Sequence, residues 1–224
     1  MATIINLETS STNCSVSIGL DGKVIALKEL DDTGYSHSEN LHVFIKEILK
    51  EASLSFNDID AIAVSKGPGS YTGLRIGVSA AKGLCFSLDV PLISILTLES
   101  LAYQLKIEEG FLLPLLDARR MEVYSAVFNE KYEQIRETKA EIIDEYSFSE
   151  YLEKGKVHFI GSGAEKCKGI INHPNAIFTT IVHTPSAKEM APLAEKKFKI
   201  SDFENVAYFE PYYLKDFVTT KPKF

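Results

Sequence analysis

The pattern of apolar and polar positions predicts an α/β protein whose two halves follow the same plan. In the first half, strands are expected at 3–7, 14–20, 23–30, 61–64 and 92–95, and helices at 36–52 and 71–88. Asp21-Gly22 is typical of a tight hairpin turn, so the first strands should form an antiparallel meander. Ser36 followed by Glu39 predicts a capping box at the start of the first helix.

The second half repeats this order of elements. Strands are expected at 112–116, 122–128, 135–143, 157–160 and 176–179, and helices at 147–154, 163–171 and 186–200. A meander followed by alternating helices and strands implies a mixed sheet in each half. We therefore predict two similar domains, residues 1–105 and 106–224, with a cleft between them. The pattern leaves open where the last helix and the tail lie.

Composition and charge narrow the class of protein. The 224 residues are 45% hydrophobic and 25% charged, as in ordinary globular proteins. No apolar run approaches the length of a membrane span, and no basic signal segment is present, so we expect a cytoplasmic protein. The net charge of −7, with basic residues clustered only at 215–223, argues against independent, tight RNA binding. Cys14, Cys85 and Cys167 lie far apart in apolar segments and are expected to be buried free thiols.

The most informative segment is the glycine-rich run from Gly67 to Gly77, which follows a predicted strand and opens a predicted helix. Such a turn can present backbone N–H groups to an anion. The spacing does not match a P-loop or a dinucleotide-binding turn, because Thr72 stands where either motif needs a glycine. On spacing alone, a glycine turn without a ligand is an equally good interpretation.

The same run carries a resemblance to a known family. Together with Leu7-Glu8-Thr9-Ser10, 117–124 and 211–215, it resembles the TsaB (YeaZ) family over essentially the whole chain. The resemblance implies tandem duplicated actin/Hsp70-like (ribonuclease H-like) domains with mixed sheets. It also implies a role in making N6-threonylcarbamoyladenosine at position 37 of tRNAs that read ANN codons.

In that role, the family member is a non-catalytic partner subunit that binds and activates the catalytic paralogue TsaD. The ATPase TsaE joins the two, and tRNA is contacted only through the complex. TsaD binds its metal through an H-x-x-x-H pair, and the matching positions here hold Thr97 and Leu101. Leucine cannot coordinate a cation, so no metal site and no catalytic residues are expected. His37 and His42 cannot replace the pair, because residues five apart on a helix point roughly 140° away from each other.

The helix that follows the glycine turn predicts a partner interface. Glycines inside a helix cost roughly 1 kcal/mol each, so the spacing of Gly73, Gly77 and Ala81 suggests close packing against another helix. In the family, this helix and the preceding one pack against the equivalent pair of TsaD, and the same surface can form a homodimer. The predicted interface residues are Leu41, Ile45, Gly73, Leu74, Gly77, Val78, Ala81, Lys82 and Cys85. This helix carries two apolar stripes, which run through Leu74, Val78, Ala81, Cys85 and Leu88 and through Ile76, Ala80 and Leu84. The alternative is that both stripes are covered within the chain.

Nucleotide binding stays open at this point. The resemblance to actin-like ATPases places two carboxylates, Glu8 and Asp117, where Mg²⁺ is held. Glu8 is one methylene longer than the usual Asp, which weakens such a site. Weak binding of ATP or ADP with Mg²⁺ would use Glu8, Thr9, Ser10, Gly69, Asp117, Gly161 and Gly163, although no cofactor is expected to be required. The alternative function is a stand-alone actin-fold small-molecule kinase or ATPase, which calorimetry with ATP would distinguish.

Overall fold

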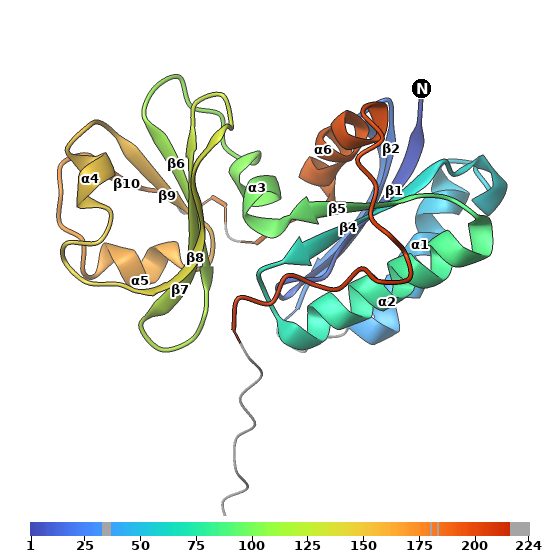
Figure 1. Ribbon diagram of the computed structural model, residues 1–224, viewed down its shortest axis with the longest axis horizontal. Helices are drawn as coiled ribbons and strands as arrows, with labels where there is room; N and C mark the ends of the chain where they lie inside the picture. The colour runs from blue at the N-terminus through green and yellow to red at the C-terminus, as the bar shows by residue number, and fades with distance from the viewer. Residues whose placement is uncertain (33–36, 180, 183, 216–224) are drawn as a thin grey trace, which may run out of the picture.

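The computed structural model describes residues 1–32, 37–179, 181–182 and 184–215, which form two five-stranded mixed sheets (Figure 1). The first sheet has the order β3-β2-β1-β4-β5, and the second has the order β10-β9-β6-β7-β8. The strands of the first are β1 (Thr3–Glu8), β2 (Asn13–Leu20), β3 (Lys23–Asp31), β4 (Ala61–Gly67) and β5 (Leu92–Leu96). Those of the second are β6 (Phe111–Asp117), β7 (Glu122–Asn129), β8 (Gln134–Ile142), β9 (Val157–Ile160) and β10 (Ala176–Phe178).

Strand pairing confirms the predicted duplication. In the first sheet β1–β2 and β2–β3 are antiparallel, while β1–β4 and β4–β5 are parallel. The pairs β6–β7, β7–β8, β6–β9 and β9–β10 repeat that arrangement in the second sheet. The predicted fold class, α/β with tandem mixed sheets, is therefore correct.

The helices agree with the predicted pattern in position and differ mainly in length. They are α1 (His37–Glu51), α2 (Tyr71–Leu88), α3 (Thr97–Ala102), α4 (Ser149–Leu152), α5 (Ala164–Lys168) and α6 (Ala187–Lys199), with a 3₁₀ turn η1 (Phe56–Asp58). The predicted cap at Ser36 lies outside the described residues. Helices α4 and α5 are shorter than the patterns at 147–154 and 163–171 suggested, since only their central residues adopt helical hydrogen bonding.

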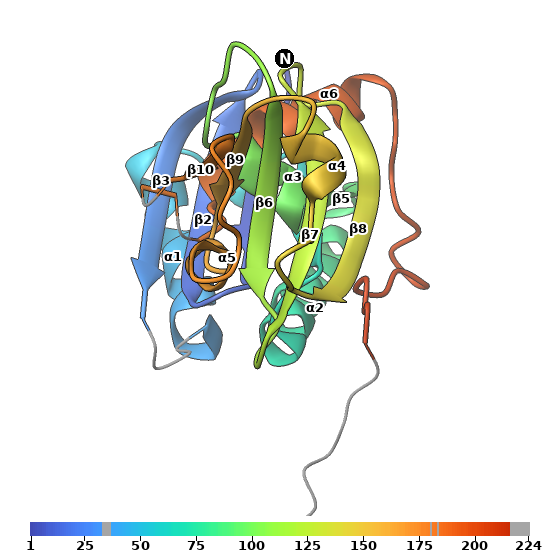
Figure 2. The ribbon, with the colours of Figure 1, turned by 90° about the vertical axis from the view of Figure 1, so that its left-hand side faces the viewer.

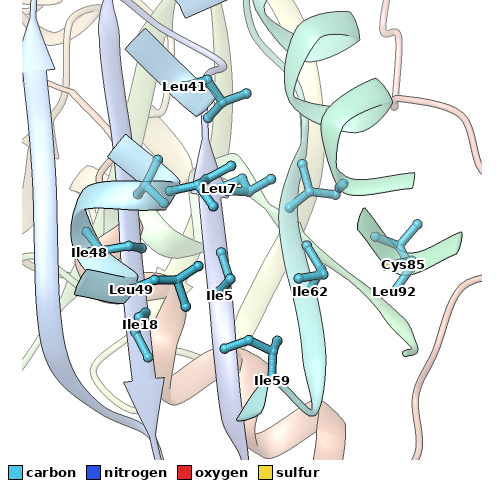
Figure 3. Close-up of a cluster of buried hydrophobic side chains, with 14 of the residues drawn as sticks. Ile5, Leu7, Ile18, Leu41, Ile48, Leu49, Ile59, Ile62, Cys85 and Leu92 are labelled. Atoms are coloured by element: carbon cyan, nitrogen blue, oxygen red, sulfur yellow. The ribbon is translucent and has the colours of Figure 1, made fainter. Parts of the chain in front are cut away.

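Helices α1 and α2 cover one face of the first sheet. Figure 3 shows the core between them, in which side chains of both helices meet those of β1, β2, β4 and β5. The labelled core residues are Ile5, Leu7, Ile18, Leu41, Ile48, Leu49, Ile59, Ile62, Cys85 and Leu92. All are 5% exposed or less, so the sides of these two helices that face the sheet are buried within the chain.

Helix α6 covers the opposite face of the first sheet, although it follows the second sheet in sequence. Its Met190 and Ala194 pack in one cluster with Ala63 and Ile93. The small side chains of β4 leave room for the helix on this face. The predicted C-terminal domain, residues 106–224, thus sends its last helix back to the first domain.

The second sheet also carries helices on both faces. Helices α4 and α5 lie on its outer face, while α3 lies behind it, toward the first sheet (Figure 2). Leu98 and Leu101 of α3 pack with Leu112 and Phe128 of the second sheet. Helix α3 therefore lies between the two sheets, where the sequence predicted a cleft.

The segment 203–213, here called the C-terminal strap, runs back along α2 (Figure 1). The amide of Glu204 donates to the carbonyl of Leu92 at 2.8 Å, and that of Tyr212 donates to the carbonyl of Lys66 at 2.7 Å. Lys82 on α2 donates to the strap carbonyls of Ala207 and Phe209 at 3.2 and 3.0 Å. The strap covers the edge of β5, which would otherwise expose unpaired backbone groups.

Candidate functional site

The glycine-rich run packs against the chain's own β1–β2 loop. Ser70 caps α2 by accepting a hydrogen bond from the amide of Gly73 at 3.2 Å. A Cβ at Gly73 would overlap the carbonyl oxygen of Thr9, and one at Gly77 would overlap the hydroxyl of Thr9. The prediction that these glycines pack closely against another helix is wrong. Gly73 and Gly77 pack against Thr9 of the β1–β2 loop instead.

Direct hydrogen bonds hold the loop in place. The Thr9 hydroxyl donates to the carbonyl of Gly73 at 2.8 Å, and the amide of Ser70 donates to the carbonyl of Ser10 at 2.6 Å. A Cβ at Gly69 would also overlap Ser10. Thr9 and Ser10 are both buried. The place that a phosphate would need at this turn is therefore filled by the protein itself.

The carboxyl of Glu8 lies under this loop and is fully buried. Its Oε1 accepts hydrogen bonds from the amide of Ser10 at 2.6 Å and from the hydroxyl of Ser65 at 2.8 Å. Its Oε2 has no hydrogen-bond partner within the described chain. Burial raises the pKa of Glu8 above its usual value, despite these hydrogen bonds. A carboxylate without exposed oxygen does not fit a ligand of nucleotide-bound Mg²⁺.

The second predicted carboxylate, Asp117, is exposed at the end of β6 but already paired. Its Oδ1 accepts hydrogen bonds from Lys166 Nζ at 2.7 Å and from the amide of Arg119 at 2.6 Å. Its own amide donates to the Ser162 hydroxyl at 3.1 Å. These bonds fix the turn after β6, and they leave the carboxylate neutralised by a lysine.

The turn around Gly161 and Gly163 also serves internal packing. A Cβ at Gly161 would overlap the carbonyl of Leu115, and the amide of Gly163 donates to that same carbonyl at 3.1 Å. Both predicted halves of the nucleotide site are thus occupied by contacts within the chain, so the residues present do not fit ATP or ADP with Mg²⁺.

The positions that match the H-x-x-x-H pair lie inside the protein. Thr97 and Leu101 are fully buried on α3. Within residues 1–32, 37–179, 181–182 and 184–215, no group of three His, Cys, Asp or Glu side chains could hold a metal ion. Cys14, Cys85 and Cys167 are buried and free, as predicted, and burial raises the pKa of Cys85 to about 12. In the same part of the chain, no helix is both long and apolar enough to cross a bilayer.

A groove of about 610 Å³ separates the strap from β8 and from the ends of β4 and β5. Its lining consists of Lys66, Leu96, Gln134, Glu137, Thr138, Glu204, Tyr208, Phe209, Glu210, Pro211 and Tyr212. Three of these side chains are carboxylates and one is a lysine. The excess of negative charge disfavours a phosphate-bearing ligand in this groove.

Most of the predicted interface residues face the core of their own chain. Leu41, Ile45, Gly73, Leu74, Gly77, Val78, Ala81 and Cys85 are buried, and Lys82 binds the strap. This stripe of α2 is therefore covered within the chain. The second stripe, Ile76, Ala80 and Leu84, is only partly covered.

The most exposed large apolar side chain on α1 and α2 belongs to a residue outside the predicted interface set. Phe86 near the end of α2 is 87% exposed, and Val43 on α1 is 48% exposed. Both residues lie on the side of their helix opposite its buried residues, and we call this outward face of the two helices the α1–α2 surface. A signal for Phe86 is present in the sequence, because it is an apolar residue on the narrow polar strip formed by Arg75, Ser79 and Lys82.

Comparisons with known proteins find relatives named TsaB and a family model described for TsaD. A family model described as "TsaD: tRNA N6-adenosine threonylcarbamoyltransferase" matches residues 31–223. The "tRNA threonylcarbamoyladenosine biosynthesis protein TsaB" of Escherichia coli (strain K12) is 30% identical over 97% of this chain and 96% of that protein. The protein of the same name from Bacillus subtilis (strain 168) is 29% identical over 87% of this chain and 88% of its own length.

A solved structure shows the same fold. The crystal structure of an uncharacterized Pseudomonas aeruginosa protein with similarity to peptidase YEAZ aligns with a TM-score of 0.84. The alignment covers 96% of this chain and all of that one, at 23% sequence identity.

Proposed function

The chain belongs to the TsaB family, and we propose on that basis that it is the non-catalytic subunit that binds and activates a TsaD-type threonylcarbamoyltransferase. Its role in forming tRNA threonylcarbamoyladenosine follows from the family. The observation that carries the proposal is the closed glycine turn. In the described structure, the groups that an actin-fold enzyme would present to a nucleotide or a metal are buried or paired within the chain.

Catalysis needs groups that can reach a substrate. Glu8, Thr97 and Leu101 are fully buried, and Asp117 is paired with Lys166. These contacts support an accessory role, in which the chain contributes surface and shape rather than reacting groups. They also favour the accessory role over a stand-alone kinase or ATPase.

The α1–α2 surface is the face that we assign to the TsaD-type partner. A partner with the same duplicated fold carries an equivalent helix pair, and two such pairs can pack as a four-helix bundle. Phe86 supplies the exposed aromatic anchor that is typical of an interface hot spot. The same surface would form a homodimer when the partner is absent. The TsaE-type ATPase remains part of the proposal without a surface assigned to it.

Co-purification tests this function directly. The purified chain should co-elute with the TsaD of the same genome and stimulate modification of tRNA by it. Phe86→Asp should weaken the association about 30-fold or more, which corresponds to a hot-spot loss of about 2 kcal/mol. Ile200→Asp is the matched control, since Ile200 is 75% exposed and follows α6, on the opposite face of the first sheet.

Two results would contradict the proposal: a wild-type chain that leaves TsaD activity unchanged, or a Phe86→Asp variant that binds as well as the control. Gly77→Leu and Ala81→Glu would not test this surface, because each would disturb the chain's own core. Calorimetry of the isolated chain with ATP and Mg²⁺ should show no binding, because the site described above does not fit them. Tight binding with turnover would favour the kinase or ATPase alternative.

A further inference from the structure

Basic and aromatic side chains from separate segments gather where α2 begins, β6 ends and the strap finishes. We call this group the basic rim. Its members are Tyr71, Arg75, Arg119, Arg120, Tyr124, Lys166, Tyr213 and Lys215. The sequence showed no basic cluster before the tail, because these residues are brought together only by the fold.

Ring contacts connect the first sheet's side of the rim to the strap. The guanidinium of Arg75 lies 4.6 Å above the ring of Tyr71, and that ring lies 4.9 Å from the ring of Tyr213. Two residues later, Lys215 Nζ lies 5.7 Å from the ring of Tyr124 on β7. The end of the strap therefore contacts both α2 and β7.

Ionic contacts extend the rim along the second sheet. Lys215 forms an ion pair with Glu122, and Lys166 Nζ donates to the carbonyl of Glu122 at 3.0 Å. Lys166 also holds Asp117 at 2.7 Å, and Arg119 and Arg120 follow Asp117 in the β6–β7 turn. The rim is therefore one connected surface.

The rim carries a net positive charge in a chain whose net charge is −7. Each of its two carboxylates, Asp117 and Glu122, is matched by one lysine. Arg75, Arg119 and Arg120 are exposed, and none of them forms an ion pair with another described residue. Three arginine charges are thus left for a ligand.

The backbone at the β6–β7 turn supports a role for the arginine side chains. Arg119 and Arg120 have φ values of 69° and 52°, in the left-handed region that glycine and asparagine adopt most easily. Arginine at both positions is unfavourable for the turn itself. The arginines at these positions are therefore better explained by an interaction of their side chains with another molecule than by the needs of the turn.

We propose that the basic rim binds the backbone phosphates of a single-stranded RNA segment, with the exposed ring of Tyr213 beside it for base stacking. Guanidinium groups match phosphate oxygens in bidentate geometry, and unstacked bases pack on aromatic rings. An acidic protein surface would use the arginines but would have no need of the Tyr213 ring. The proposal rests on the proposed function, because tRNA is the nucleic acid that the function brings to this chain, and it replaces the prediction that tRNA is touched only by other subunits.

Fluorescence anisotropy with a labelled RNA hairpin that has a single-stranded loop tests the rim on the isolated, full-length chain. At about 50 mM salt the Debye length is roughly 14 Å, so the rim can act despite the distant negative charges. The double variant Arg119→Glu/Arg120→Glu should bind at least about tenfold more weakly. The plot of the logarithm of the binding constant against the logarithm of the salt concentration should become less steep by about 1.4. This is the change expected when two phosphate contacts to a single strand are lost.

The matched control is Lys131→Glu/Lys154→Glu, which changes the net charge equally at exposed sites on the opposite ends of the second sheet's strands. The control should bind within twofold of the wild type. Tyr213→Ala should reduce the preference for the hairpin over a fully paired RNA duplex, whereas Tyr146→Ala, at an exposed tyrosine outside the rim, should not.

Three results would overturn the assignment: no RNA binding by the wild type, equal losses in the rim and control variants, or polyglutamate competing as well as RNA of equal charge. The last result would identify an acidic protein as the occupant. Co-elution with TsaD separates this proposal from the proposed function. The Arg119→Glu/Arg120→Glu variant should still co-elute through the α1–α2 surface, whereas a wild-type chain that fails to co-elute would contradict the function and not the rim.

Discussion

At the scale of single residues, Glu8 shows how a position inherited from a catalytic fold can change its use. The resemblance placed it as a weakened Mg²⁺ ligand. The structure places its carboxyl inside the protein, where it accepts hydrogen bonds from the backbone of Ser10 and the hydroxyl of Ser65. The Glu8 carboxyl holds the β1–β2 loop against α2. Removing this acid from water is unfavourable, and the same burial raises its pKa.

We predict that Glu8 makes stability fall as pH rises. The pKa of Glu8 in the folded state lies above its ordinary value of 4.5, so the folded state binds the proton more tightly than the unfolded state does. The resulting stabilisation is complete below pH 4.5 and is lost as the pH rises through the folded pKa. Glu8→Gln keeps an acceptor oxygen but removes the charge. The free energy of unfolding of this variant should therefore increase relative to that of the wild type as the pH rises.

Urea denaturation at a series of pH values measures this difference. Glu47→Gln, on the exposed side of α1, serves as the control and should follow the wild type. Parallel pH profiles for the wild type and Glu8→Gln would show that the buried carboxyl does not govern the trend.

At the scale of the element, helix α2 contributes to the core and also to two separate surfaces, the α1–α2 surface and the basic rim. Its buried stripe and its first two glycines close the β1–β2 loop, and its exposed Phe86 belongs to the α1–α2 surface. Its first turns carry Tyr71 and Arg75 of the basic rim. One helix therefore connects the proposed partner surface to the proposed RNA surface, which would let both act in one complex.

Two glycines of α2 should respond to alanine in opposite directions. Gly73→Ala puts a methyl group into the backbone of Thr9 and should destabilise the protein by about 1–3 kcal/mol. At Gly83 a Cβ meets no atom within 4 Å, so Gly83→Ala should stabilise the exposed helix by about 0.5–1 kcal/mol. Thermal or urea unfolding of the two variants gives the comparison, and a stabilised Gly73→Ala would refute the close approach.

At the scale of the whole molecule, the two sheets share one topology, but the elements that cover them differ. Helix α6 and the strap return to the first sheet, and α3 lies between the two sheets. The strap then reaches the second sheet through Lys215 and Glu122. The first domain is thereby covered on both faces and along one edge, while the end of the strap joins both domains.

We predict that Lys82 is the main attachment of the strap to α2. Lys82→Met keeps the apolar stem and removes the ammonium that binds two strap carbonyls, which should destabilise the strap locally by about 1–2 kcal/mol. Hydrogen exchange should therefore quicken at the amides of Glu204 and Tyr212, while β4 stays protected. Lys46→Met, at an exposed site on α1, is the control, and equal exchange in both variants would argue against the attachment.

The sequence by itself determined the order of the elements, the duplication and the family. These follow from local periodicity, from the turn at Asp21-Gly22 and from the glycine-rich run, all of which are encoded over a few neighbouring residues. The same local signals could not say what Gly73 and Gly77 pack against, because two different neighbours satisfy the same spacing. The tertiary structure supplied that neighbour, the β1–β2 loop.

Only the tertiary structure decided which candidate residues remain accessible. Glu8 and the predicted interface stripe became buried because elements distant in sequence cover them, and Phe86 remained exposed because none does. The basic rim likewise depends on contacts between residues far apart, such as Tyr71 with Tyr213 and Lys215 with Tyr124. Burial and charge clustering are properties of the whole packed chain, so a linear pattern can indicate the elements but not the surfaces they form together.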